Sequence, residues 1–225
     1  MATRSEAGGP LVSALTVGAF QENCYLVADE EAGRGVLVDP GAEGERILAM
    51  VRDAGVAIDA IWLTHAHLDH VGGIAAVKRA MDVPVYMHPL DAPVLAFADR
   101  SAAMYGIPFE APPPADRALA DGEILRVGRF EFRVLHVPGH APGHVVFDGP
   151  GIALVGDLIF AGSIGRTDLP LSNPADMQRS LERAAREIAP ASTLCPGHGP
   201  ATTMAEELRA NPFLSGMARV AGARG

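Results

Sequence analysis

Short apolar stretches rich in β-branched residues, separated by glycine, asparagine or acidic residues, fill the first forty positions of the chain. They predict strands at 11–17, 24–28 and 35–39. The apolar residues then change to a helical spacing, which predicts a helix over 44–55 that ends at Gly55. The region that follows alternates between the two patterns. It predicts strands at 58–64 and 83–87, and helices from about Val71 to Met81 and over 90–105.

The second half of the chain shows clearer hairpins. Alternating apolar and polar residues over 124–137, with Gly128 at the centre, predict a β-hairpin. The proline-rich segment 111–116 is predicted to be a surface loop, because the segments on either side are each too incomplete to close a core. The remaining expected elements are a strand pair at 144–148 and 152–157, a helix over 174–189 capped by Asn173, a strand at 192–196 and a short helix over 203–210.

This mixture of hairpins and intervening helices predicts an α+β fold, in which two sheets pack face to face and helices cover them. We expect the whole chain, residues 1–225, to form one domain.

Composition narrows the class of protein. The 225 residues include 18 Lys and Arg against 27 Asp and Glu, a formal net charge of −9, and Lys78 is the single lysine. This balance is wrong for a general binder of nucleic acid or of an anionic membrane surface. No apolar run approaches the roughly 20 residues of a membrane span, and residues 1–17 lack the apolar stretch of a signal peptide. Two cysteines cannot form a disulfide framework, so we expect a soluble, cytoplasmic protein.

The strongest chemical signal is the segment 64–70, Thr-His-Ala-His-Leu-Asp-His, which follows a buried strand and precedes a helix. Residues two apart in an extended segment point the same way, so His65 and His67 can face one ion. Where the chain turns, Asp69 and His70 can face a second ion. Helix capping is the alternative, but it needs one aspartate and leaves three clustered imidazoles unexplained. The segment therefore predicts a metal site.

Three further residues follow strands and can complete such a site. His140 and His198 lie in turns of glycine and proline, and Asp157 ends an apolar strand, where a carboxylate is costly unless it is paired or bound to metal. Each residue alone is a weak signal. Together they place metal-ligand side chains at the ends of three strands, where loops gather into a site.

These motifs, in this order, resemble the metallo-β-lactamase superfamily, whose fold is a four-layer αββα sandwich with a metal site at one edge. The segment GDLIFAGSIGRTDLP (156–170) resembles the glyoxalase II-like branch, the hydroxyacylglutathione hydrolases, in its compact bacterial form. The resemblance implies two metal-ligand sets that share Asp157 as a bridge. The ligands would be His65, His67 and His140 for one ion, and Asp69, His70 and His198 for the other.

Such a ligand set implies two divalent metal ions and a hydroxide that bridges them. A water bound between two cations loses its proton near neutral pH, which supplies a nucleophile without serine or cysteine. Asp69 would hold and orient this water. Five histidines and two carboxylates without a thiolate suit zinc, iron and manganese. We expect zinc, with iron or manganese as alternatives.

Several other residues are candidates of lower rank. By the resemblance His144 lies behind the ligands, and His88 and His136 are expected to be hydrogen-bonded packing residues. Cys24 and Cys195 are expected to be buried small hydrophobic residues. Arg166 has two interpretations: a buried pair with Asp168 that braces its loop, or a contact with an anionic substrate. The candidates of lower rank are therefore His144, His88, His136, Cys24, Cys195, Arg166 and Asp168.

The resemblance implies a hydrolase that cleaves a small-molecule thioester, S-2-hydroxyacylglutathione. Only residues 199–225 follow His198, too few for the helical domain that supplies much of the glutathione pocket in the long form of this branch. The rival interpretation is a persulfide dioxygenase on the same fold, which would use one iron at His65, His140 and Asp157. Lactone and β-lactam hydrolysis, and a metal-bearing scaffold without activity, rank below these two. The oligomeric state is left open.

Overall fold

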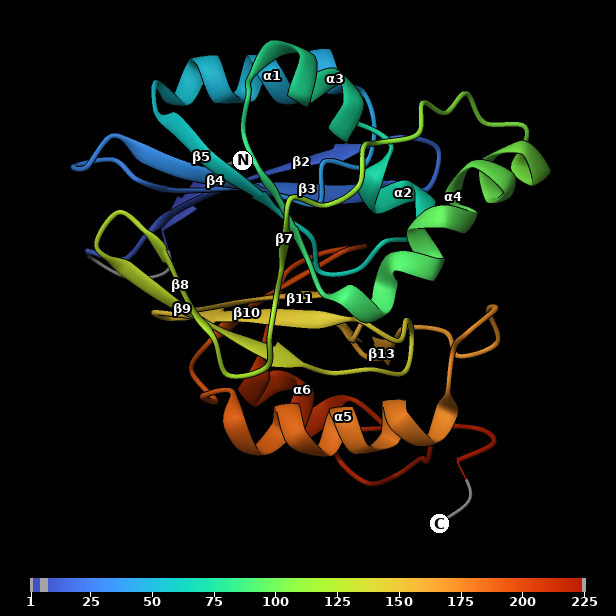
Figure 1. Ribbon diagram of the computed structural model, residues 1–225. Helices are drawn as coiled ribbons and strands as arrows, with labels where there is room; N and C mark the ends of the chain where they lie inside the picture. Colours follow the sequence, from blue (N-terminus) through green and yellow to red (C-terminus); the bar gives the residue numbers. More distant parts are fainter. Residues whose placement is uncertain (1, 5–7, 224–225) are drawn as a thin grey trace.

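The computed structural model describes residues 2–4 and 8–223, and two β-sheets packed face to face form its centre (Figure 1). The first sheet has seven strands in chain order. Its first four strands are antiparallel neighbours, and the last four run parallel. The strands are β1 (Ala2–Arg4), β2 (Leu11–Val17), β3 (Glu22–Asp29), β4 (Arg34–Val38), β5 (Ala57–Trp62), β6 (Val85–Met87) and β7 (Arg117–Ala118).

The second sheet has six strands in the order β15-β14-β11-β10-β9-β8. Only β11 and β14 are parallel neighbours within it. A separate two-stranded hairpin, β12–β13, follows β11 in the chain. The strands are β8 (Ile124–Val127), β9 (Phe130–His136), β10 (Val145–Gly149), β11 (Ile152–Gly156), β12 (Ile159–Phe160), β13 (Ser163–Ile164), β14 (Thr193–Pro196) and β15 (Thr202–Thr203).

Helices cover the outer faces of both sheets, which confirms the predicted α+β, four-layer αββα sandwich (Figure 1). Helices α1 (Gly44–Ala54) and α3 (Ile74–Ala80) lie over the first sheet, and α5 (Pro174–Glu187) and α6 (Met204–Ala210) lie under the second. Helix α4 (Ala92–Tyr105) projects at the side, after the one-turn helix η1 (Pro89–Asp91). No helix in the described part of the chain is long and apolar enough to cross a bilayer.

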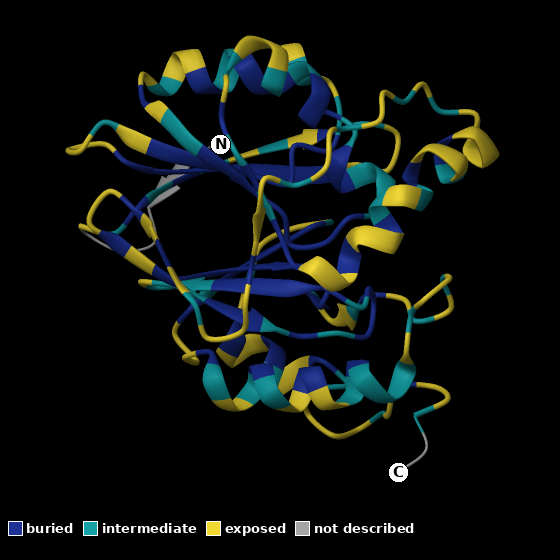
Figure 2. Ribbon diagram, in the orientation of Figure 1, coloured by how far each residue is buried: buried dark blue, intermediate teal, exposed yellow. Residues whose placement is uncertain are grey.

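The core between the sheets is made of large apolar side chains, and both sheets are buried on their facing sides (Figure 2). Trp62 of β5 packs against Phe147 and Phe132 of the second sheet, with ring centroids 5.0 and 5.6 Å apart. All three side chains are fully buried. Because the apolar core holds the two sheets together, it fixes the edge at which their loops meet.

The predicted elements recur within a few residues of their observed bounds, and the 124–137 hairpin turns at Gly128, whose φ is 54°. Asn173 caps α5 by accepting the backbone N–H groups of Ala175 and Asp176, at 2.9 and 3.1 Å. Segment 111–116 is a loop without regular structure, as expected. The short strands β1, β7, β12, β13 and β15 were not predicted, because two or three residues give no periodic pattern.

The predicted helix from Val71 to Met81 is wrong in one respect. The structure has two helices there, α2 (Leu68–Val71) and α3, separated by Gly72 and Gly73. A Cβ atom at these glycines would lie 2.6 Å from the carbonyl oxygen of Gly41 and 2.7 Å from that of Pro40, respectively. Only glycine allows this close approach of another loop, and the adjacent glycines are themselves the local signal that ends the helix.

Candidate metal centre

The histidine-rich segment leaves β5 and enters α2 at the edge where the two sheets open. His65 is fully buried, and His67 occupies the position before the first residue of α2. The His67 side chain makes no capping hydrogen bond to α2. The capping alternative for this segment therefore has no support in the structure, and its imidazoles are turned toward other loops.

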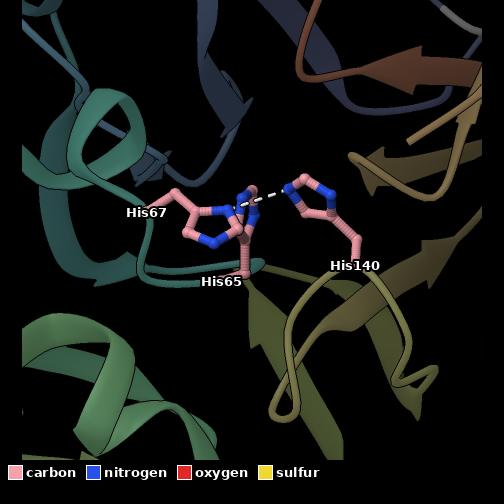
Figure 3. A group of neighbouring side chains, drawn as sticks. All are labelled: His65, His67 and His140. Atoms are coloured by element: carbon pink, nitrogen blue, oxygen red, sulfur yellow. Dashed lines mark hydrogen bonds between the residues drawn. The ribbon is translucent and has the colours of Figure 1, made fainter. Parts of the chain in front are cut away.

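Three histidines from two loops form the first cluster. The ring centroids of His65 and His67 lie 4.8 Å apart, and those of His65 and His140 lie 4.9 Å apart. Nδ1 of His67 lies 2.8 Å from Nε2 of His140, which comes from the loop between β9 and β10 (Figure 3). One nitrogen atom from each of the three residues falls within 4.8 Å of the others, so the set can hold one metal ion.

A second cluster lies beside the first and joins Asp69, His70 and His198 within the same limit of 4.8 Å. Oδ2 of Asp69 lies 3.2 Å from Nε2 of His198 and 3.9 Å from Nε2 of His70. His198 follows β14, at the far end of the chain from the other two. In the described part of the chain three groups of three residues could each hold an ion. Two have the membership that the resemblance implied, and the third joins Asp39 to His65 and His70.

Asp157, the residue after β11, reaches both clusters. Its Oδ2 lies 3.4 Å from Nε2 of His140 and 3.6 Å from Nε2 of His198, and its Oδ1 lies 3.5 Å from Nε2 of His70. Burial raises the pKa of this carboxyl, but His70 and His140 more than reverse the effect, so the pKa lies below its usual value. Asp157 is therefore an ionised carboxylate between the two clusters.

Hydrogen bonds on the outer side of His65, His70, His140 and His198 leave a nitrogen lone pair of each ring directed into the clusters. Nδ1 of His70 donates to Oδ2 of Asp39 at 3.0 Å. The Thr64 hydroxyl also donates to Oδ2 of Asp39, at 2.5 Å, so its oxygen is free to accept from Nδ1 of His65, at 3.1 Å. In the neutral form, Nε2 of His65 and of His70 then carries no proton, which is the state that binds a metal ion.

Backbone carbonyls do the same for the two histidines of the later loops. Nδ1 of His140 donates to the carbonyl oxygen of Arg166 at 2.8 Å, and Nδ1 of His198 donates to that of Phe20 at 3.1 Å. Nε2 of each ring is thus the inward-facing atom. An acceptor behind each ligand that fixes its orientation is the usual arrangement around a protein-bound metal.

Several buried polar atoms of the clusters have no hydrogen-bond partner among the described residues. They are Nε2 of His65, Nε2 of His70 and Oδ1 of Asp157. Such atoms are costly when they stay unpaired. Burial also lowers the pKa of His65 well below its usual value, which keeps this ring neutral. The neutral imidazole of His65 and the ionised carboxylate of Asp157 fit a divalent metal ion. Burial lowers the pKa of His70, but Asp157 and Asp39 more than reverse the effect, so this ring would give up a proton when it binds metal.

Three carboxylates that support the site were not found by sequence reasoning. Asp39 has φ 49°, and it also accepts the backbone N–H of Thr64 at 2.8 Å. Asp91 is fully buried and accepts the N–H groups of Ala66 and Gly143. Glu22 is buried with no hydrogen-bond partner for either oxygen among the described residues, and burial raises its pKa well above its usual value. Each is a single acidic residue away from other ligand-type residues, so the sequence shows no motif that would identify it as part of a site.

His144 stands behind the clusters. Its ring stacks on that of His65, with centroids 5.0 Å apart, and its Nε2 accepts the backbone N–H of Asp157 at 3.0 Å. This bond holds Asp157 at the end of β11. His144 belongs to none of the candidate metal-binding groups in the described part of the chain.

The other histidines and the cysteines have packing roles. The rings of His88 and His136 stack 4.1 Å apart, and Nε2 of His136 donates to the carbonyl of Pro142 at 2.9 Å. Both Cys24 and Cys195 are buried and free. Burial raises the pKa of Cys195 to about 12, so its thiol is not a ready nucleophile.

Arg166 does pair with Asp168, but the pair is not buried as the bracing interpretation required. Two hydrogen bonds of 2.7 and 2.8 Å join the side chains, which are 59% and 69% exposed. The link from Arg166 to the clusters runs through its backbone carbonyl, which holds His140. Its side chain lines a cavity of about 720 Å³, and the cluster residues that line the same cavity are His67, Asp69, His140, Asp157 and His198.

Comparison with known proteins gives a consistent result. A family model described as "Metallo-beta-lactamase superfamily" matches residues 17–198. A Haemophilus influenzae protein named hydroxyacylglutathione hydrolase GloC is 34% identical over 91% of this chain and 98% of its own length.

Two solved structures are similar over nearly their whole length. TTHA1623 in a di-iron-bound form superposes with a TM-score of 0.82 and 46% identity, covering 90% of this chain and 100% of that one. BLEG-1, a B3 metallo-β-lactamase, superposes with a TM-score of 0.84 and 32% identity, covering 91% of this chain and 99% of that one. The family match spans most of the chain and includes every residue of the two clusters, so the protein belongs to the metallo-β-lactamase superfamily.

Proposed function

We propose that this protein is a binuclear metal-dependent thioesterase that hydrolyses S-2-hydroxyacylglutathione to a hydroxy acid and glutathione. The observation that carries the proposal is the pair of complete three-residue clusters, with Asp157 between them, on the floor of one cavity. The similarity to GloC supports the thioester substrate, and the di-iron-bound relative supports two divalent ions. Zinc, iron and manganese all suit the donor set.

Two divalent ions held there would lower the pKa of a shared water toward neutrality and polarise the thioester carbonyl. The protein's own residues set the geometry of this reaction. Asp69, within 3.2 Å of His198, lies at the cavity floor and would hold and orient the attacking water. In the overall reaction the oxygen of water forms a bond to the acyl carbon and the carbon–sulfur bond breaks. Glutathione leaves as a thiolate and takes up a proton that the water has lost.

The outer hydrogen bonds keep the inward atoms in place between turnovers. Asp39 holds His70, and the carbonyl of Arg166 holds His140. Because these acceptors are part of the folded scaffold, little reorganisation is needed when the transition state forms.

The rival activity is persulfide dioxygenation by one iron bound to His65, His140 and Asp157. That mechanism has no use for the second cluster, yet Asp69, His70 and His198 converge as closely as the first group does. This convergence favours the hydrolase.

The test is an assay of S-lactoylglutathione hydrolysis by the metal-loaded protein, run beside oxygen uptake with glutathione persulfide and beside β-lactam cleavage. We expect thiol release from the thioester. The kcat/KM for this reaction should fall at least about 100-fold in Asp69→Ala. Asp53→Ala, an exposed carboxylate on α1, is the matched control and should keep full activity. Oxygen uptake with an intact thioester, or cleavage of the β-lactam alone, would refute the proposal.

A further inference from the structure

The cavity over the clusters has walls that differ in chemistry from its floor. One wall is the face of α4 that turns toward the site, where Val94 and Ala98 are buried and Phe97 is half-buried. At the end of this helix Met104 and Tyr105 also line the cavity, although they are 74% and 57% exposed. Ser101 and Tyr105 are the polar side chains on this wall among the described residues, and the rest of it is apolar.

The opposite wall is equally apolar. It is formed by the β12–β13 hairpin and the loop after it, which contribute Phe160, Ile164, Leu169 and Leu171. Leu171 is 56% exposed and has a φ of 68°, a backbone conformation that leucine rarely adopts. The fold thus holds a large apolar side chain at the cavity mouth rather than in the core.

A third segment, the loop before β3, meets the α4 wall at an aromatic contact. Phe20, from the loop before β3, meets Tyr105 edge to face with ring centroids 5.3 Å apart. Phe20 is also the residue whose carbonyl holds His198. Phe20 therefore links the second cluster to the apolar end of α4.

Positive charge for the carboxylates of glutathione is scarce in this cavity. Arg166 is the one basic side chain other than histidine among the described residues that line it. Both of its hydrogen bonds go to Asp168, which already neutralises it. Recognition of substrate must therefore come mainly from apolar contact.

We propose that this cavity selects thioesters whose acyl group is a bulky apolar chain or ring, over those with the smallest acyl groups. The inference rests on the thioesterase activity proposed above and names its preferred substrate class. A volume of about 720 Å³ accommodates such a group together with part of the thiol carrier. Each methylene that leaves water for an apolar wall should tighten binding about two- to fourfold.

Binding of thioether analogues tests this without turnover. We would measure the Kd of S-methylglutathione and S-hexylglutathione for the metal-loaded protein by calorimetry. Five additional methylenes should tighten binding at least about thirtyfold. Phe97→Ala should reduce this ratio to below about tenfold, whereas Ile124→Ala, an exposed apolar residue of β8 outside the cavity, should leave it unchanged. Equal binding of the two thioethers, within about threefold, would overturn the proposal.

Kinetics separate this inference from the proposed function. S-mandeloylglutathione should show a kcat/KM at least about tenfold above that of S-lactoylglutathione, after division by the rate constants for hydroxide-catalysed hydrolysis. If both esters are hydrolysed equally well, the thioesterase stands and the apolar preference is wrong. If neither is hydrolysed while S-hexylglutathione binds at least about thirtyfold tighter, the thioesterase is wrong and the apolar preference stands.

Discussion

Asp91 joins the two loops that carry the first cluster, and its removal should both destabilise the fold and weaken metal binding. Its Oδ2 accepts the N–H of Ala66 at 2.8 Å, between His65 and His67. Its Oδ1 accepts the N–H of Gly143 at 2.5 Å, three residues after His140. Since Asp91 is fully buried, water cannot replace these bonds.

The size of the effect follows from the two N–H groups. Asp91→Ala leaves both without an acceptor, at about 1–3 kcal/mol each, so we expect unfolding to require about 4 kcal/mol less free energy. Asp91→Asn keeps one acceptor and should cost about 1–3 kcal/mol. Because the ligand loops lose their tie, the affinity for metal should fall about 10- to 100-fold in both variants.

The cost of Asp91→Asn should also depend on pH. Burial raises the pKa of Asp91 to about 6, although two backbone N–H groups oppose the rise. A carboxyl whose folded pKa is raised binds more protons folded than unfolded, so its contribution to stability falls as pH rises from about 4 to 6. Asparagine does not titrate. The penalty of the substitution should therefore be largest near pH 4 and shrink by about 2 kcal/mol between pH 4 and pH 7.

The assay is urea unfolding of the chelator-treated protein, followed by the fluorescence of Trp62, the single tryptophan, which is buried. Metal affinity is measured separately by competition with a chromophoric chelator. Asp53→Ala on α1 is the control for loss of an exposed carboxylate. If Asp91→Ala unfolds within about 0.5 kcal/mol of the unsubstituted protein, the bridging role assigned to Asp91 is wrong.

Five further substitutions have definite expected outcomes. Asp157→Ala should lower the occupancy of both metal positions in elemental analysis, and full occupancy would remove Asp157 from the ligand set. Cys24→Ala and Cys195→Ala should keep kcat/KM within about tenfold, since neither thiol is the nucleophile; a folded, metal-loaded but inactive Cys195→Ala would contradict this. Arg166→Ala should leave metal content unchanged, because His140 bonds to the backbone carbonyl of Arg166 and not to its side chain. A loss of metal in this variant would mean that the side chain is needed to hold the site. Asn173→Ala should lower the free energy of unfolding by about 1 kcal/mol, whereas no change would mean that water replaces the cap.

The parts of the site that could be predicted are those whose residues carry a local pattern. The segment 64–70 predicts a metal site because ligand-type residues are concentrated in it. His140, Asp157 and His198 stand out because each follows a strand. The sheets and most helices follow likewise from periodicities of two and of about 3.6 residues.

The rest depends on contacts between segments distant in the sequence. Asp39 reaches His70 and Asp91 reaches Gly143 only because separate loops meet at the sheet edge. Gly72 and Gly73 break a helix because the backbone near Pro40 and Gly41 passes too close for any side chain. Such contacts leave no periodic trace in the sequence.

The most direct test of the account is the number of metal ions per chain in protein saturated with metal and then freed of excess. We predict close to two ions, and close to one in His198→Ala, which removes a ligand from the second cluster alone. One iron per chain in the unsubstituted protein, unchanged in His198→Ala, would contradict the binuclear centre.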